Sequence, residues 1–254
     1  MSKESTSESL HESKERTIGP LLQELKETET AKEDDLLSNA VTRMLYHDYS
    51  QLPVLSTEGK YVGFISWKSI VAASRTGKDA FYVKECLDKN MLILRGDEPL
   101  LSTVQLIYAH DFALIEPSGE KPYRIITTYD LATTLHDITE PFLILEQIEA
   151  DIRAILESVA SFDEIHAQLP LPKNRTCFAD LRFSDYIKFF ENYDFWERTR
   201  LTIDRPFFTE RLDAVRKIRN SIMHFKVFKP EKTDLDELQS MKEFLALLRP
   251  DQQD

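Results

Sequence analysis

The chain has 254 residues, of which 42% are apolar, so it can form one large domain or two small ones. Its formal net charge of -12 argues against a protein whose whole surface attracts nucleic acid. Two cysteines are too few for a disulfide framework, and no apolar run reaches the ~18 residues that a membrane helix needs. We therefore expect a cytoplasmic protein with no membrane segment. The histidines and cysteines share no metal-ligand spacing, so we also expect no metal site.

Residues 1–16 form a polar segment rich in Ser, Glu and Lys, without an apolar signal sequence. Such a segment buries too little apolar surface to order itself. We expect a disordered tail here.

An internal repeat follows the tail. His47-Asp48-Tyr49 returns as His110-Asp111-Phe112, each time after a helical pattern and before two short apolar strands joined by a turn. Each copy then closes with a hydroxyl-bearing residue and a further helix. The predicted strands are residues 52–55 and 61–65 in the first copy, and 112–115 and 123–126 in the second.

The order helix, strand, strand, helix, repeated at about 60 residues, resembles a tandem pair of CBS domains over residues 17–138, with copies at about 17–78 and 79–138. The runs D-Y-S-Q-L-P-V, Y-V-G-F-I-S-W-K-S-I and R-I-I-T-T-Y-D-L carry the resemblance. The resemblance implies an α+β module that binds AMP, ADP or ATP as a regulatory ligand, in clefts between its sheets.

The resemblance also indicates which residues would bind the nucleotide. Thr127 and Asp130 match the hydroxyl after the last strand and the acid three residues later, which can bind phosphate and ribose. In the first copy Ser66 keeps the hydroxyl and Gln51, just before the first predicted strand, is a further candidate binding residue, but Ser69 replaces the acid. We therefore expect at most one complete ribose site. The alternative is that the second-copy pair only caps the next helix.

The second half of the chain, residues 139–250, is predicted to be an all-α domain. Its first helix is expected to start at Thr139-Glu140-Pro141, because Thr is a good N-cap and Pro is tolerated in a first turn. Residues 162–180 contain two prolines and suggest a loop or a short helix. Helical patterns then cover residues 184–192, with Ser184 as the cap, 207–225 and 234–248.

One polar helix face carries the candidate chemistry. At about 100° per residue, the apolar residues of 213–225 fall on one arc and Arg219, Asn220 and His224 on the other. Residues 173–232 hold 14 Lys or Arg and 9 Asp or Glu, a local net charge of +5 in an acidic chain. Arg can bind a phosphate and His can move a proton near neutral pH, a combination suited to RNA cleavage. Such a face is also common on helices that are merely solvated.

The run R-N-S-I-M-H resembles the Arg-x4-6-His signature of HEPN domains, and the flanking F-S-D-Y-I-K-F-F and W-E-R-T-R-L match the HEPN module fused to CBS pairs in prokaryotic proteins. This resemblance implies a homodimer with a composite active site and metal-independent endoribonuclease chemistry. Arg219 would bind the scissile phosphate, His224 would be the general acid or base, and Asn220 would position both. Two alternatives remain: a non-catalytic RNA-binding or protein-interaction scaffold that responds to nucleotide, and a structural dimer without ligand.

Overall fold

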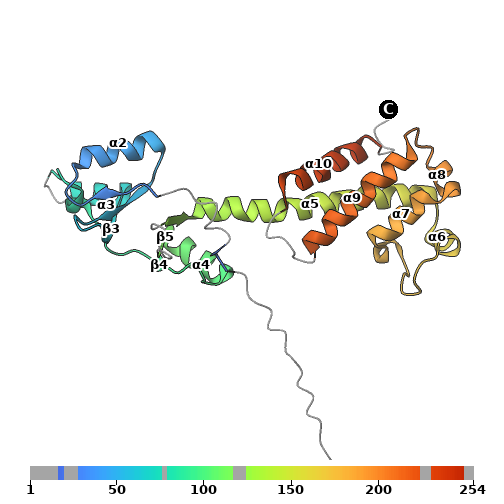
Figure 1. The fold of residues 1–254 in the computed structure, drawn as a ribbon, viewed down its shortest axis with the longest axis horizontal. Coiled ribbons are helices and arrows are strands. Elements are labelled where there is room, and N and C mark those ends of the chain that lie inside the picture. The colour runs from blue at the N-terminus through green and yellow to red at the C-terminus, as the bar shows by residue number, and fades with distance from the viewer. Residues whose placement is uncertain (1–16, 20–27, 76–78, 117–123, 224–229, 249–254) are drawn as a thin grey trace, which may run out of the picture. The chain divides into compact units, whose positions relative to one another are not determined.

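The computed structural model describes residues 17–19, 28–75, 79–116, 124–223 and 230–248, shown as a ribbon in Figure 1. The expected disordered tail lies outside these residues. The internal contacts divide the chain into two compact units, one up to Thr134 and one from Leu135. We call them the first unit and the helical unit.

The first unit is an α+β structure built from two copies of one pattern, as predicted. Each copy has a three-stranded sheet whose first two strands are parallel and whose last two are antiparallel. The first copy comprises β1 (Ala31–Lys32), α2 (Leu37–His47), β2 (Gln51–Leu55), β3 (Tyr61–Ser66) and α3 (Trp67–Ser74). The second copy comprises β4 (Ile93–Leu94), α4 (Leu100–His110), β5 (Phe112–Ile115), β6 (Arg124–Thr127) and the start of α5 (Thr128–Val159).

The repeated His-Asp pair marks the end of a helix in both copies. Asp48 and Asp111 follow the last residues of α2 and α4 and have positive φ angles of 56° and 67°. Asp48 lies in the left-handed helical region, which Asn and Asp adopt most readily among residues other than Gly, whereas Asp111 has a ψ angle of -31° outside that region. The repeat seen in the sequence is therefore a repeated turn from helix to strand, and His47 and His110 are helix-end residues.

Each copy is completed by the segment that precedes the other copy. The amide of Ile18 donates to the carbonyl of Glu98 at 3.0 Å, just before α4. The amide of Val83 donates to the carbonyl of Asp35 at 3.0 Å, just before α2. Both Ile18 and Val83 are fully buried. The two copies therefore interlock, and we expect neither to be stable without the other.

Gly63 in β3 allows a close approach of the segment that joins the two copies. Phe64 and Asp88 exchange two backbone hydrogen bonds of 2.9 and 2.8 Å. A Cβ atom on Gly63, where φ is +154°, would lie 2.5 Å from the carbonyl oxygen of Asp88.

We expect Gly63→Ala to lower the free energy of unfolding by about 2–4 kcal/mol, because both steric overlap and backbone strain are introduced. Chemical denaturation measures this loss. Gly59→Ala is the control, because φ there is +77° but no atom lies within 4 Å of the new Cβ. Equal losses for the two variants would contradict the close approach at Gly63.

The helical unit contains helices and no strand within its described residues, in agreement with the all-α prediction. It comprises the rest of α5, α6 (Phe162–Gln168), α7 (Phe183–Glu191), α8 (Tyr193–Thr199), α9 (Arg205–Met223) and α10 (Lys232–Leu247). Its core is rich in aromatic residues, with Phe190 in edge contact with Phe208 at 5.0 Å. Tyr193, at the start of α8, is 63% exposed and lies outside this core.

The predicted helix start at Thr139 is wrong. Helix α5 runs without interruption from Thr128 to Val159, and Pro141 lies inside it. The hydroxyl of Thr139 does not cap a new helix but donates to the carbonyl of Leu135 one turn earlier, at 2.7 Å. Pro141 removes one backbone hydrogen bond. Burial of the apolar residues that follow, such as Ile144 and Ile148, offsets that loss.

Two other helix starts show which side chains act as caps. The predicted cap Ser184 lies within the first turn of α7, where Asp185 instead accepts from the amide of Arg182 at 3.0 Å. Helix α9 starts at Arg205, two residues before the predicted start, and Asp204 just before it accepts from the amide of Phe207 at 2.7 Å. Residues 162–180 contain α6 and a 3-10 turn at Phe178–Asp180.

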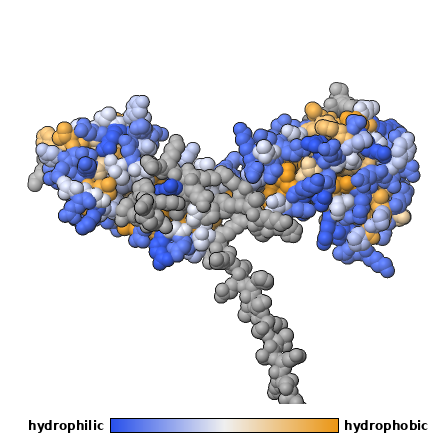
Figure 2. All heavy atoms as spheres, viewed as in Figure 1, coloured by the Kyte–Doolittle hydropathy of each residue, from blue (hydrophilic) through white to orange (hydrophobic). Residues whose placement is uncertain are grey.

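The surface of the helical unit is mostly hydrophilic in the space-filling view, with apolar residues showing between the polar ones (Figure 2). Large apolar side chains that are more than half exposed include Leu143, Phe207 and Leu247.

Candidate functional site

The structure brings Thr127 and Asp130 into direct contact at the junction of β6 and α5. The amide and the hydroxyl of Thr127 both donate to Oδ2 of Asp130, at 2.8 and 2.6 Å. The amide of Asp130 donates back to the hydroxyl of Thr127 at 3.3 Å. Both side chains are half-buried. These reciprocal bonds form a capping box, so Thr127 and Asp130 do cap the start of α5 in this structure.

The first copy builds the same cap without a carboxylate. The amide of Ser66 donates to the hydroxyl of Ser69 at 2.9 Å, and the amide of Ser69 donates to the hydroxyl of Ser66 at 3.1 Å. Gln51 lies opposite Ser66 in the sheet register, and its side-chain oxygen accepts from the hydroxyl of Ser50. The hydroxyl of Ser69, at the third residue of α3, is thus enough to complete the cap. Capping therefore does not require the negative charge that Asp130 carries at the equivalent position in the second copy.

Arg219 lies on the partly exposed face of α9, as the helical pattern predicted, but it forms an ion pair with an acid. Its Nε donates to Oε1 of Glu149 at 3.0 Å, which joins α9 to α5. The side chains of Arg219 and Glu149 are 30% and 21% exposed, and Asn220 beside them is half-buried. His224 lies outside the described residues. Sequence reasoning missed Glu149, because a residue 70 positions away leaves no local signal.

The charges of three helices gather around Tyr186 of α7, which is 1% exposed. Burial, followed by the nearby carboxylate of Glu149, raises the pKa of Tyr186 to about 12, although Arg153 and Arg219 act in the opposite direction. The phenol therefore stays protonated at physiological pH. Glu149, Arg153, Tyr186 and Arg219 therefore form a polar cluster that includes the arginine of the predicted RNA-binding face.

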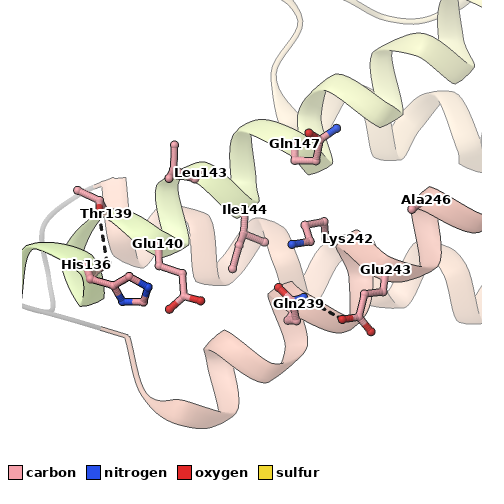
Figure 3. A pocket seen from close by; sticks show the side chains of 10 residues that line it. All are labelled: His136, Thr139, Glu140, Leu143, Ile144, Gln147, Gln239, Lys242, Glu243 and Ala246. Atoms are coloured by element: carbon pink, nitrogen blue, oxygen red, sulfur yellow. Dashed lines mark hydrogen bonds between the residues drawn. The ribbon is translucent and has the colours of Figure 1, made fainter. Parts of the chain in front are cut away.

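A pocket of about 520 Å³ lies between α5 and α10 (Figure 3). Leu143, Ile144 and Ala246 supply apolar surface, and charged residues such as Glu140 and Lys242 line the rest. The pocket contains none of the residues that the sequence predicted for nucleotide or RNA.

Neither a metal site nor a membrane helix is seen in the described residues. No three His, Cys, Asp or Glu side chains among them gather closely enough to hold a metal ion. Within the same ranges, no helix has the length and apolar content to cross a membrane.

Comparison with known families gives one match, to the CBS domain, over residues 25–76. The matched range covers the first copy of the repeat. A search of curated proteins finds no match.

Several solved structures resemble about half of the chain. CBSX2 in complex with AMP has 15% identity and a TM-score of 0.42, over 48% of this chain and 98% of that one. A hypothetical conserved protein from Geobacillus kaustophilus has 24% identity and a TM-score of 0.41, over 48% and 97%. A CBS-domain-containing protein from Agrobacterium tumefaciens has 15% identity and a TM-score of 0.41, over 49% and 96%.

Proposed function

Because the chain contains a CBS domain, we propose that its first unit is a sensor of adenine nucleotides, and that AMP, ADP or ATP binds beside Thr127 and Asp130. CBS pairs, which the repeat resembles, bind such nucleotides as regulatory ligands. The observation that carries the proposal is the difference between two equivalent caps. The second copy holds a carboxylate at Asp130 where the first copy uses the hydroxyl of Ser69.

Each group in this proposed site has a role that fits its chemistry. The Asp130 carboxylate accepts hydrogen bonds from the ribose hydroxyls, and charge-assisted bonds of this kind are stronger than neutral ones. The N-terminus of α5 carries partial positive charge and so favours a phosphate. The Thr127 hydroxyl donates to that phosphate when it exchanges its bond to Asp130 for one to the ligand. Ser66 and Gln51 in the first copy offer only neutral groups, so a site there is weaker.

A thermal-shift titration of the full chain with AMP, ADP and ATP tests the sensor proposal. At a ligand concentration 100 times Kd, the folded state gains about 2.7 kcal/mol, which raises the melting temperature by several degrees. GMP serves as the control for base recognition. The absence of a shift with all three adenine nucleotides would contradict the proposal.

We also propose that the helical unit is the output module and binds RNA in the manner of HEPN domains, as a homodimer. The arrangement of α9 supports this proposal. Its apolar residues Leu212, Val215 and Ile218 are buried, while Arg219 and Asn220 remain partly exposed on the same helix. In the catalytic form Arg219 binds the scissile phosphate, Asn220 positions the reacting groups, and His224 transfers the proton as the 2'-hydroxyl attacks.

Incubation of RNA with the protein in EDTA tests for metal-independent cleavage. We expect cleavage by the wild type and a rate lower by about 10²–10⁴-fold for His224→Ala, because a general acid or base contributes that much. Circular dichroism and the mass of the dimer control for folding. RNA binding that depends on Arg219 without any cleavage would favour the non-catalytic scaffold, and the lack of both would favour a structural dimer.

A further inference from the structure

Glu149 forms an ion pair with Arg219, the residue that binds an RNA phosphate in the proposed function. The contact is 3.0 Å long and joins a carboxylate of α5 to the guanidinium of α9. A carboxylate and a phosphate bind the fork of guanidinium donors in similar ways. Glu149 takes the Nε donor of Arg219, so an RNA phosphate that binds the guanidinium through its Nε edge competes with Glu149 for that donor.

The burial of this pair is intermediate, which distinguishes it from the structural ion pair of the same unit. Arg175 and Asp185 are 7% and 3% exposed, and their pair lies inside the core. Arg219 and Glu149 are 30% and 21% exposed, so an incoming ligand can reach them. Partial burial also weakens solvent screening, which makes the carboxylate an effective competitor.

Other cations on α9 are held by acids in different ways. Arg216 and Lys217 pair with Asp213 on their own helix, at 2.7 and 2.9 Å. Movement of α9 as a rigid body leaves such pairs intact. The pair of Arg219 depends instead on the position of α5 relative to α9. The same helix α5 begins at Thr128, next to the proposed nucleotide site, and carries Glu149 further along.

We propose that Glu149 is a built-in competitor that holds Arg219 in an RNA-free state, so that RNA binding requires its release. This inference rests on the proposed role of Arg219 as the phosphate ligand. Loss of the Glu149 charge leaves Arg153 and Arg219 beside Tyr186, together with Asp185, whose carboxylate is already paired with Arg175.

The test compares Glu149→Gln with Glu146→Gln. Glu146 lies on the exposed side of the same helix, so its variant makes the same change in net charge. Binding of a labelled, mixed-sequence single-stranded RNA is followed by fluorescence anisotropy. We expect Glu149→Gln to bind about 5–50-fold more tightly than wild type, because a hydrogen bond to a charged group contributes about 1.5–3 kcal/mol, part of which the amide retains. Glu146→Gln should stay within about twofold of wild type, since screened surface charges contribute little.

A double variant identifies the source of the gain. Adding Arg219→Gln to Glu149→Gln should abolish the gain. If Glu149→Gln is unstable by circular dichroism, Glu149→Met, which keeps the length of the side chain without the charge, gives the same comparison.

The possible failures are distinct. Arg219-dependent RNA binding in wild type with no gain in Glu149→Gln overturns the competitor role and leaves the proposed function standing. An equal gain in Glu146→Gln also overturns it, because the effect is then one of net charge. If neither wild type nor Glu149→Gln binds RNA, the proposed RNA function fails and the inference fails with it.

Discussion

Asp185→Ala should lower the free energy of unfolding of the helical unit by about 3–5 kcal/mol, because it leaves a buried cation without its partner. Asp185 is 3% exposed and accepts from Nε of Arg175, itself 7% exposed, at 3.0 Å. The same carboxylate accepts from the amide of Arg182 at the start of α7. The substitution therefore removes an ion pair and a helix cap together.

Urea denaturation followed by tryptophan fluorescence measures this loss. A Trp67→Phe background leaves Trp196, which is 7% exposed in the core of the helical unit, as the reporter. Asp213→Ala is the matched control, because its pairs with Arg216 and Lys217 lie near the surface and exposed pairs contribute about 0–1 kcal/mol. Similar losses for Asp185→Ala and Asp213→Ala would show that the buried ion pair contributes no more to the free energy of unfolding than a surface pair.

Asp130→Ser should weaken AMP binding by about 10–100-fold, because hydrogen bonds to a charged group contribute about 1.5–3 kcal/mol and each 1.4 kcal/mol is tenfold. Stability should change by less than about 1 kcal/mol, because serine forms the same reciprocal cap at Ser69 in the first copy. The variant thus separates the carboxylate from the cap. Equilibrium dialysis with labelled AMP gives the affinity, and thermal melts give the stability.

Ser69→Ala provides the opposite control. It removes the reciprocal half of the α3 cap, the bond from the amide of Ser66, and leaves the Ser66 hydroxyl in place, so the first unit should lose about 0.5–1.5 kcal/mol of stability. AMP affinity should not change, because the second copy is untouched. Wild-type AMP affinity in Asp130→Ser would mean that Thr127 and Asp130 only cap α5 and do not bind the nucleotide.

The sequence predicted the repeat because its signals are local. Alternating apolar residues mark the strands, and Asp48 and Asp111 mark equivalent turns with positive φ. It failed at Pro141, because the packing of the residues that follow decides whether a helix continues through a proline. The tendency of Thr to cap helices, which suggested a helix start at Thr139, says nothing about how the apolar residues after Pro141 pack.

The helical pattern also predicted which side of α9 is buried, since Val215, Ile218 and Ile222 all lie in the core. It did not predict what the opposite side would meet. Arg219 pairs with Glu149, a residue far away in the chain, and the pairing depends on how α5 and α9 pack. A helical pattern describes one element at a time, so such contacts between helices lie beyond it.

The stoichiometry of AMP binding tests the central claim most directly, because it counts the sites rather than detecting a ligand. Isothermal titration of the full chain should give one AMP per chain, since Asp130 supplies a carboxylate in the second copy and Ser69 supplies only a hydroxyl in the first. Two equivalent AMP molecules per chain would show that the carboxylate does not define the site. No measurable binding of AMP, ADP or ATP would remove the sensor role from this protein.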